Sequence, residues 1–129
     1  MSILAETLTD TGYDISSELL LDTFVAPRGG NYTFQIRLSS IPTNDQDISI
    51  RLELTDAADA VLAPAQFTCS YAKLAAANTT FGVPMFGSTF MVTGEKMNIY
   101  AESTDGTATA VDYRIDCLYA DELTGGGIQ

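Results

Sequence analysis

Three stretches of the chain alternate between apolar and polar residues with a period of two: residues 32–38, 48–54 and 111–119. Successive side chains of a β-strand point to opposite faces of its sheet, so each stretch has one face for a core and one for water. The side chains predicted to share the core faces are Tyr32, Phe34, Ile36, Leu38, Ile48, Ile50, Leu52, Leu54, Val111, Tyr113, Ile115, Cys117 and Tyr119.

Charged residues within these stretches determine which face is outward. Arg37, Arg51 and Arg114 occupy the phase opposite to the apolar side chains, and a slip of one residue would bury them. Turn residues and composition predict four further strands, at residues 18–25, 65–71, 88–93 and 96–103. The chain is therefore predicted to be all-β: a single antiparallel β-sandwich, jelly-roll-like, with seven or eight strands.

The connections between the predicted strands give further expectations. Residues 41–46 fit a hairpin loop, and Gly94 with Glu95 form the turn of a second hairpin. Residues 72–77 are rich in alanine, and their composition favours a turn or two of helix.

The length of 129 residues fits one domain with a single core. Residues 1–14 alternate only weakly and break at Gly12, so we expect an extended N-terminal arm. Residues 15–121 then form the sandwich, and residues 122–129 form a glycine-rich C-terminal tail. The first ten residues include two acids and no basic start, which is not the pattern of a signal peptide.

The formal net charge of -11, from 17 acidic and 6 basic residues, restricts the partners. A surface this acidic repels the phosphates of nucleic acids and of anionic membranes, and no basic stripe reverses the sign locally. No run of apolar residues approaches the ~20 needed to span a bilayer. We therefore expect neither nucleic acid nor membrane as a partner.

Candidate catalytic chemistry is sparse. The chain has no histidine, and Lys73 and Lys96 lie in segments that do not predict burial. The commonest general base, transition-metal ligand and activator of nucleophiles are therefore missing. Asp112 and Asp116 share one strand face with Arg114, which favours charge pairing over glycoside hydrolysis. We expect no catalytic residue, no cofactor and no metal site.

Two acidic loops and two cysteines leave alternatives open. Residues 44–47 and 56–59 offer oxygen ligands of the kind calcium prefers, but neither matches a twelve-residue calcium loop. Asn and Asp are also common in turns for their own hydrogen bonds. Cys69 and Cys117 both fall at core positions. A disulfide across the sandwich fits this placement, and two buried thiols fit the lack of an export signal.

An interaction surface is the remaining candidate for function. The connection at residues 78–87 carries large apolar residues, which are unusual in the loop of a monomer. The arm is apolar as well, and an arm of this kind adds a strand to a neighbour's sheet edge. The alternative is that arm and loop pack on their own sandwich. The predicted interface residues are Ile3, Leu4, Leu8, Tyr13, Phe81, Met85 and Phe86.

The last part of the chain resembles the small β-domains of tailed-phage virions. Residues 94–103, GEKMNIYAES, lead through a glycine turn to residues 111–119, VDYRIDCLY. This segment looks like the closing hairpin of the capsid decoration or cement proteins. The likeness covers roughly the last quarter of the chain and contains no diagnostic motif, so no family residues are carried over.

The resemblance implies a non-enzymatic structural protein of the virion, assembled in the host cytoplasm. Proteins of this kind are often trimeric and lie over junctions between capsid subunits. Their partner is the major capsid protein or another protein lattice of the virion.

Two other classes of function stay open. The first is a tail-appendage or a carbohydrate- or receptor-binding sandwich, which an exposed aromatic cluster on loop tips would favour. Tyr13, Tyr100 and Phe86 are the aromatic side chains whose phase leaves them free for a partner. The second is an enzyme with a pair of carboxylates. An ordered arm lying on neighbouring chains would favour capsid decoration.

Overall fold

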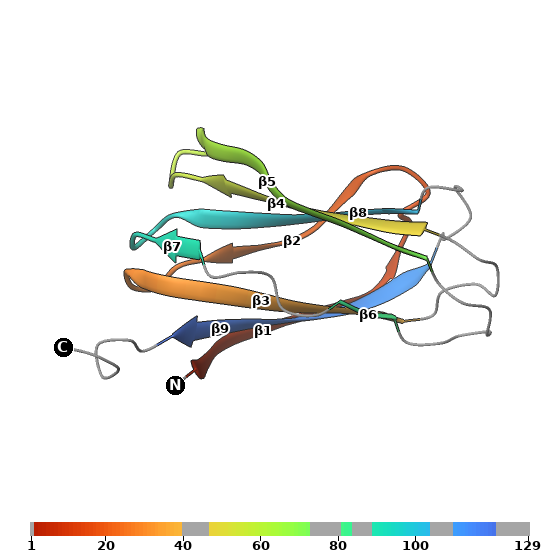
Figure 1. The fold of residues 1–129 in the computed structure, drawn as a ribbon, viewed down its shortest axis with the longest axis horizontal. Coiled ribbons are helices and arrows are strands. Elements are labelled where there is room, and N and C mark those ends of the chain that lie inside the picture. The colour runs from red at the N-terminus through yellow and green to blue at the C-terminus, as the bar shows by residue number, and fades with distance from the viewer. Residues whose placement is uncertain (1, 40–46, 73–80, 84–88, 104–109, 121–129) are drawn as a thin grey trace.

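The computed structural model describes residues 2–39, 47–72, 81–83, 89–103 and 110–120, which form nine β-strands in two packed antiparallel sheets (Figure 1). The predicted all-β sandwich is confirmed. The first sheet has the order β1 (Ser2–Tyr13), β9 (Val111–Ala120), β3 (Gly30–Ser39) and β6 (Phe81–Val83), and β7 (Thr89–Met91) also pairs with β3. The second sheet has the order β2 (Leu19–Val25), β8 (Lys96–Ser103), β4 (Asp47–Thr55) and β5 (Val61–Ala72). Within the described part of the chain, no helix has the length and apolar character that a membrane crossing requires.

The core lies between the two sheets and is built from the alternating strands. Every predicted core residue whose side chain the structure describes is buried, whereas Arg37 and Arg114 are exposed and Arg51 is half-buried on the outer face. Phe24 of β2 reaches across the sandwich to two rings of β3. Its ring centroid lies 5.1 Å from that of Tyr32 and 5.7 Å from that of Phe34. These contacts between aromatic rings hold the sheets face to face.

The N-terminal segment is a strand of the sandwich and not a separate arm. Ser2–Tyr13 pair antiparallel with β9 along their whole length, with register shifts next to Leu4 and Asp10. Of the two arrangements that the sequence left open for the arm, packing on a neighbouring chain or on its own sandwich, these residues adopt the second. The reason is that their weak alternation suffices for an edge strand, of which only Leu8 reaches the core.

Two predicted hairpins are also wrong. The strands on either side of residues 40–46 are β3 and β4, which belong to different sheets, and so do β7 and β8 on either side of Gly94 and Glu95. In a jelly roll, many connections cross from one sheet to the other, so neighbours in sequence need not pair. The hairpin between β4 and β5 does form. Of the predicted helical segment at residues 72–77, Ala72 ends β5 and the rest lies outside the described residues.

Candidate interaction surface

Large apolar side chains are exposed at one end of the sandwich. Among the described residues, eight large apolar side chains are exposed. All of them except Leu20 lie at the same end of the sandwich, where β1, β3, β5 and β8 begin and where β2, β4 and β9 end (Figure 1). We call the other seven the apolar end: Ile3, Leu4, Val25, Val61, Leu62, Phe90 and Val92.

Strand register brings the first-sheet members of the apolar end together. Asn31 at the start of β3 pairs with Phe90 of β7 on one side and with Ala120 of β9 on the other. Leu4 of β1 pairs with Leu118, two residues before Ala120. Phe90 and Leu4 therefore lie on neighbouring rows of the same outer face, because paired residues of adjacent strands share a face.

The second sheet meets the same end through its turns. Lys96 at the start of β8 pairs with Val25 and with Thr55, and Thr55 pairs with Val61. Backbone hydrogen bonds then hold the β7–β8 turn to the end of β2. The amide of Gly94 donates to the carbonyl of Ala26, and the amide of Ala26 donates to the carbonyl of Glu95, both at 2.9 Å. Both sheets thus contribute exposed apolar side chains to this end of the sandwich.

Phe90 is the most exposed member of the apolar end, with 60% of its surface accessible. The strand β7 buries Thr89 and Met91 on either side of it and turns the larger aromatic side chain outward. The Thr89 hydroxyl is buried without a hydrogen-bond partner. A large aromatic side chain that is held outward near other exposed apolar residues is typical of a surface that another molecule covers.

Sequence reasoning missed Phe90 because the phase of its short strand was ambiguous. Phe90 and Val92 alternate with Met91, so either set could face the core. The signal that could have found them is that the segment is apolar on both faces, so that whichever face packs on the core, the other exposes apolar side chains. No sequence signal connects them to Val25, Val61 or Leu4, which are distant along the chain.

The predicted interface residues of β1 divide into two groups. Ile3 and Leu4 are exposed by 40% and 54%, and they belong to the apolar end. Leu8 is buried in the core, so its assignment to an exposed interface is corrected. Tyr13 is half-buried: its ring stands edge-on to that of Tyr113 with centroids 5.2 Å apart, and its hydroxyl donates to Oδ2 of Asp10 at 2.8 Å.

The other predicted interface residues follow β5. The backbone of Phe81 begins β6 and pairs with Leu38. The side chain of Phe81, and all of Met85 and Phe86, lie outside the described residues. Their role in an interface stays a prediction.

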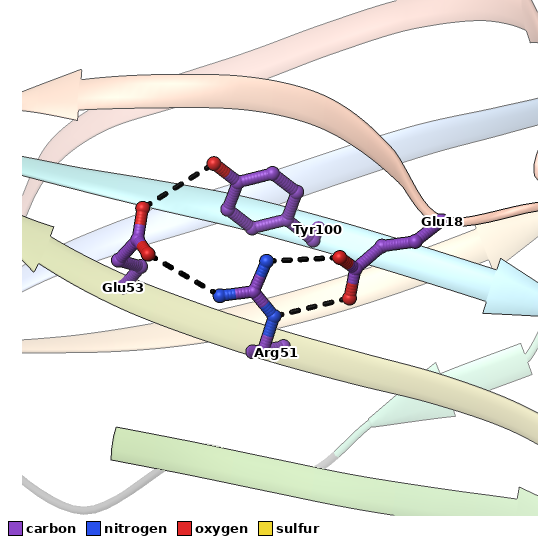
Figure 2. Close-up of polar contacts among 4 residues, drawn as sticks. All are labelled: Glu18, Arg51, Glu53 and Tyr100. Atoms are coloured by element: carbon purple, nitrogen blue, oxygen red, sulfur yellow. Dashed lines mark hydrogen bonds and ion pairs between the residues drawn. The ribbon is translucent and has the colours of Figure 1, made fainter. Parts of the chain in front are cut away.

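A cluster of four polar residues lies on the outer face of the second sheet (Figure 2). Arg51 of β4 donates two hydrogen bonds to Glu18, from Nε to Oε2 at 3.0 Å and from Nη2 to Oε1 at 2.9 Å. Its third nitrogen, Nη1, lies 3.4 Å from Oε2 of Glu53. The guanidinium also sits over the ring of Tyr100, 4.1 Å from its centroid, and the Tyr100 hydroxyl donates to Oε1 of Glu53 at 3.3 Å.

This arrangement is chemically self-contained. The hydrogen bonds from Arg51 lower the pKa of Glu18 below its ordinary value and keep the carboxyl ionised. Burial, followed by the charge of Glu53, raises the pKa of Tyr100. Arg51 covers one face of the Tyr100 ring, which the sequence predicted to be available to a partner. It also binds the carboxylates of Glu18 and Glu53. The cluster therefore pins residues 14–18 to β4 rather than presenting a free acid or base.

The other sequence candidates also have structural partners. In the acidic turn at residues 56–59, Oδ1 of Asp56 accepts the amides of Ala58 and Ala60, and Asp59 pairs with Lys96 at 2.9 Å. Within the described residues, no three Cys, Asp or Glu side chains come together as metal ligands. Residues 44–46 lie outside the described part.

Cys117 is a buried free thiol. Its pKa is raised far above the ordinary value, mainly by burial and further by Glu6, Asp116 and Asp22. A thiol held in this protonated form is a poor nucleophile. Cys69 lies on β5, and its side chain is outside the described set.

Comparison with known proteins supports the fold and no family. No protein-family model and no curated protein matches the chain. A CocE/NonD family hydrolase from Staphylococcus aureus is similar in structure, with a TM-score of 0.54 and 8% identity over 92% of this chain and 33% of the hydrolase. The chain thus spans about a third of that protein's length. The likeness supports the β-sandwich fold alone.

Two further solved structures are similar to the chain at lower TM-scores. The globular domain of zebrafish complement 1qA protein has a TM-score of 0.45 and 17% identity over 75% of this chain and 68% of its own. The structure of infectious bursal disease virus, Gx strain, has a TM-score of 0.48 and 10% identity over 92% of this chain and 31% of the viral chain.

Proposed function

We propose that the protein is a non-enzymatic structural protein of a virion that decorates the capsid, binding the major capsid protein or another virion protein lattice. We expect it to act as a homo-oligomer with three chains. The observation that supports this proposal is the apolar end, where two sheets expose seven large apolar side chains at one end of a small acidic sandwich. A surface of that kind is costly in water and is stabilised when a protein partner covers it.

The polar chemistry of the described residues supports an interaction role over a catalytic one. The carboxylates of Glu18 and Glu53 are held by Arg51, and Asp22 accepts from the Tyr113 hydroxyl at 2.7 Å. General acid–base catalysis needs a titratable group that is poised near its working pH and free to reach a substrate. Each of these three carboxylates is instead occupied by a donor of the protein itself.

A receptor-binding module is supported less well. Such a module presents aromatic side chains at its loop tips, and the sequence offered Tyr13, Tyr100 and Phe86 for that role. Phe86 lies outside the described residues. Tyr13 packs edge-on against Tyr113, and Arg51 covers Tyr100. Phe90, the exposed aromatic side chain among the described residues, lies on a strand and not at a loop tip, which fits a protein interface.

Co-sedimentation with capsids tests the proposal. The purified protein is mixed with capsids assembled from the major capsid protein of the same genome, and we expect it to pellet with them. Phe90→Ser should weaken binding by about tenfold or more, since burying an interface aromatic is worth about 2 kcal/mol. The matched control is Leu20→Ser, which removes the exposed apolar residue that lies outside the apolar end and should bind as wild type does.

Light scattering on the same samples measures the oligomeric state, for which we expect three chains. A protein that stays in the supernatant with capsids of every assembly state contradicts the proposal. Equal loss of binding in Phe90→Ser and Leu20→Ser contradicts the role of the apolar end.

A further inference from the structure

The strand β1 leaves one of its two edges open. Among the described residues, β9 is its single hydrogen-bonded neighbour, and β1 is the last strand of its sheet. Its 12 residues extend for about 40 Å at the usual rise of a strand. On the open side, backbone amide and carbonyl groups are free to pair with another extended chain.

Acidic side chains line this edge on its core-facing side. Glu6 pairs with Cys117 and Asp10 pairs with Tyr113, and both partners point into the core. Glu6 and Asp10 are nevertheless exposed, because β1 is the outermost strand. Asp22 of β2, in the facing sheet, contacts the same Tyr113. Glu6, Asp10 and Asp22 therefore place three acidic side chains where the edge strands β1 and β2 of the two sheets face each other.

Acidic side chains near this edge raise the pKa of one buried group, the Cys117 thiol. Glu6, Asp116 and Asp22 each raise the pKa of the Cys117 thiol, in addition to the larger effect of burial. Hydrogen bonds from the Thr11 amide and the Tyr13 hydroxyl lower the pKa of Asp10, so its carboxyl is ionised at neutral pH. The nearest base on β9, Arg114, is already paired with Asp116 at 3.2 Å.

These charges exclude a second copy of the chain from this edge. An antiparallel pairing of two β1 strands centred on Leu8 would place Glu6 of each copy opposite Asp10 of the other. Like charges directly opposite each other are destabilising, and inward-pointing charges on an edge strand are a known protection against self-association. The same charges attract a strand of opposite sign.

We propose that the open edge of β1 binds an extended basic segment of a partner protein, which adds to the sheet as a further strand. Lysine or arginine at alternate positions of that segment lies on the side of Glu6 and Asp10, toward Asp22, and the apolar residues between them lie on the outer face, the side of Leu4. The identification of the partner as a capsid protein rests on the proposed function. The proposal that the edge binds a basic strand does not rest on that function, because it follows from the open edge and the acidic side chains of β1.

A decapeptide of alternating valine and lysine is the probe. It is titrated into the isotope-labelled full chain at low salt, and backbone amide shifts are followed by NMR. We expect the largest shifts in β1 and β9, and slower amide exchange in β1. The same peptide with N-methyl groups at every second residue keeps its charge but loses one row of strand hydrogen bonds, and we expect it to bind at least tenfold more weakly. Equal binding of the two peptides, or largest shifts in strands other than β1, β9 and β2, would overturn the proposal.

A charge-reversal pair tests the role of the acids. Glu6→Lys changes the charge at the edge, and Glu102→Lys makes the same change on β8 in the other sheet. We expect Glu6→Lys to weaken peptide binding by about tenfold and Glu102→Lys to leave it within about twofold at moderate salt. Equal effects of the two variants would show attraction to the net charge alone and would overturn the assignment to this edge.

The same samples keep this inference distinct from the proposed function. A chain that co-sediments with capsids but does not bind the peptide retains the proposed function and loses the β1 site. A chain that binds the peptide through β1 but does not co-sediment with capsids retains the β1 site and loses the proposed function.

Discussion

The hydroxyl oxygen of Tyr113 lies 2.7 Å from Oδ2 of Asp22, so a side-chain hydrogen bond joins β9 of one sheet to β2 of the other. The carbonyl oxygen of Leu21 lies 2.9 Å from the same hydroxyl. Burial, with Asp22 adding to it, raises the pKa of Tyr113 well above its ordinary value of 10.0. The phenol therefore keeps its proton, and this bond persists across the neutral and mildly alkaline range.

Replacing Tyr113 by phenylalanine should lower the free energy of unfolding by about 1.5 kcal/mol. The substitution keeps the buried ring but removes the donor to an ionised carboxylate, and bonds of that kind contribute about 1.5–3 kcal/mol. Tyr100→Phe is the matched control, because it removes a tyrosine hydroxyl that donates to Glu53 on the outer face of the second sheet, away from Tyr113. Urea denaturation of the three proteins measures the difference. Equal losses in the two variants would show that the bond between the sheets has no special weight.

Gly30 cannot accept a side chain, because the ring of Tyr119 occupies the space. A Cβ at this position would lie 2.2 Å from Cε1 of Tyr119, whereas a Cβ at Gly29 meets only the carbonyl oxygen of Met91 at 3.7 Å. The Arg28 guanidinium covers the same ring at 4.1 Å from its centroid, so the ring has little freedom to move away. Gly30→Ala should therefore cost about 2 kcal/mol or more, and Gly29→Ala less than about 0.5 kcal/mol.

Thermal and urea unfolding of the two glycine variants check this prediction. An unfolding midpoint for Gly30→Ala that matches that of Gly29→Ala would mean that Tyr119 can rotate aside at no cost.

The stability of the fold should fall in acid, in part through Glu18. The pKa of Glu18 is lowered from 4.5 by its hydrogen bonds with Arg51. A carboxyl with a lowered folded-state pKa contributes stability that is present above its unfolded pKa and is lost as the pH falls through the folded value. We expect the unfolding free energy to drop from about pH 5 to about pH 3, and Glu18→Gln to make that drop shallower.

Urea titrations at a series of pH values measure the slope. A Glu18→Gln slope identical to that of the wild type would contradict the contribution of the Arg51 pair.

The strands and their faces could be predicted from the sequence, whereas their partners could not. Alternation placed Phe34, Ile36 and Ile115 in the core and Arg37 on the surface, because a period of two is a local property of a strand. Strand pairing is not local. Thr7 donates to Asp116 across a separation of 109 residues, and no pattern within β1 indicates that β9 is its neighbour.

The candidate surface was partly predictable for the same reason. Ile3 and Leu4 could be named because a short apolar run at an edge is visible in the sequence. Phe90 and Val61 join them only through the crossing of strands between the two sheets. The error at Leu8 has the same origin, since its burial depends on which strand β1 joins.

Two leucines of β1 separate folding from binding. Leu8 is buried next to Ile115, whereas Leu4 is 54% exposed at the apolar end. Leu8→Ala leaves a cavity and should lower the free energy of unfolding by about 2–3 kcal/mol, while Leu4→Ala should change it by less than about 0.5 kcal/mol. For attachment to capsids we expect the reverse order: Leu4→Ala weakens co-sedimentation, and folded Leu8→Ala binds as the wild type does. Urea denaturation and capsid co-sedimentation on the same preparations measure both quantities. Loss of attachment in Leu8→Ala with Leu4→Ala unaffected would place the contact on the core-facing side of β1 and would contradict the assignment of Leu4 to the interface.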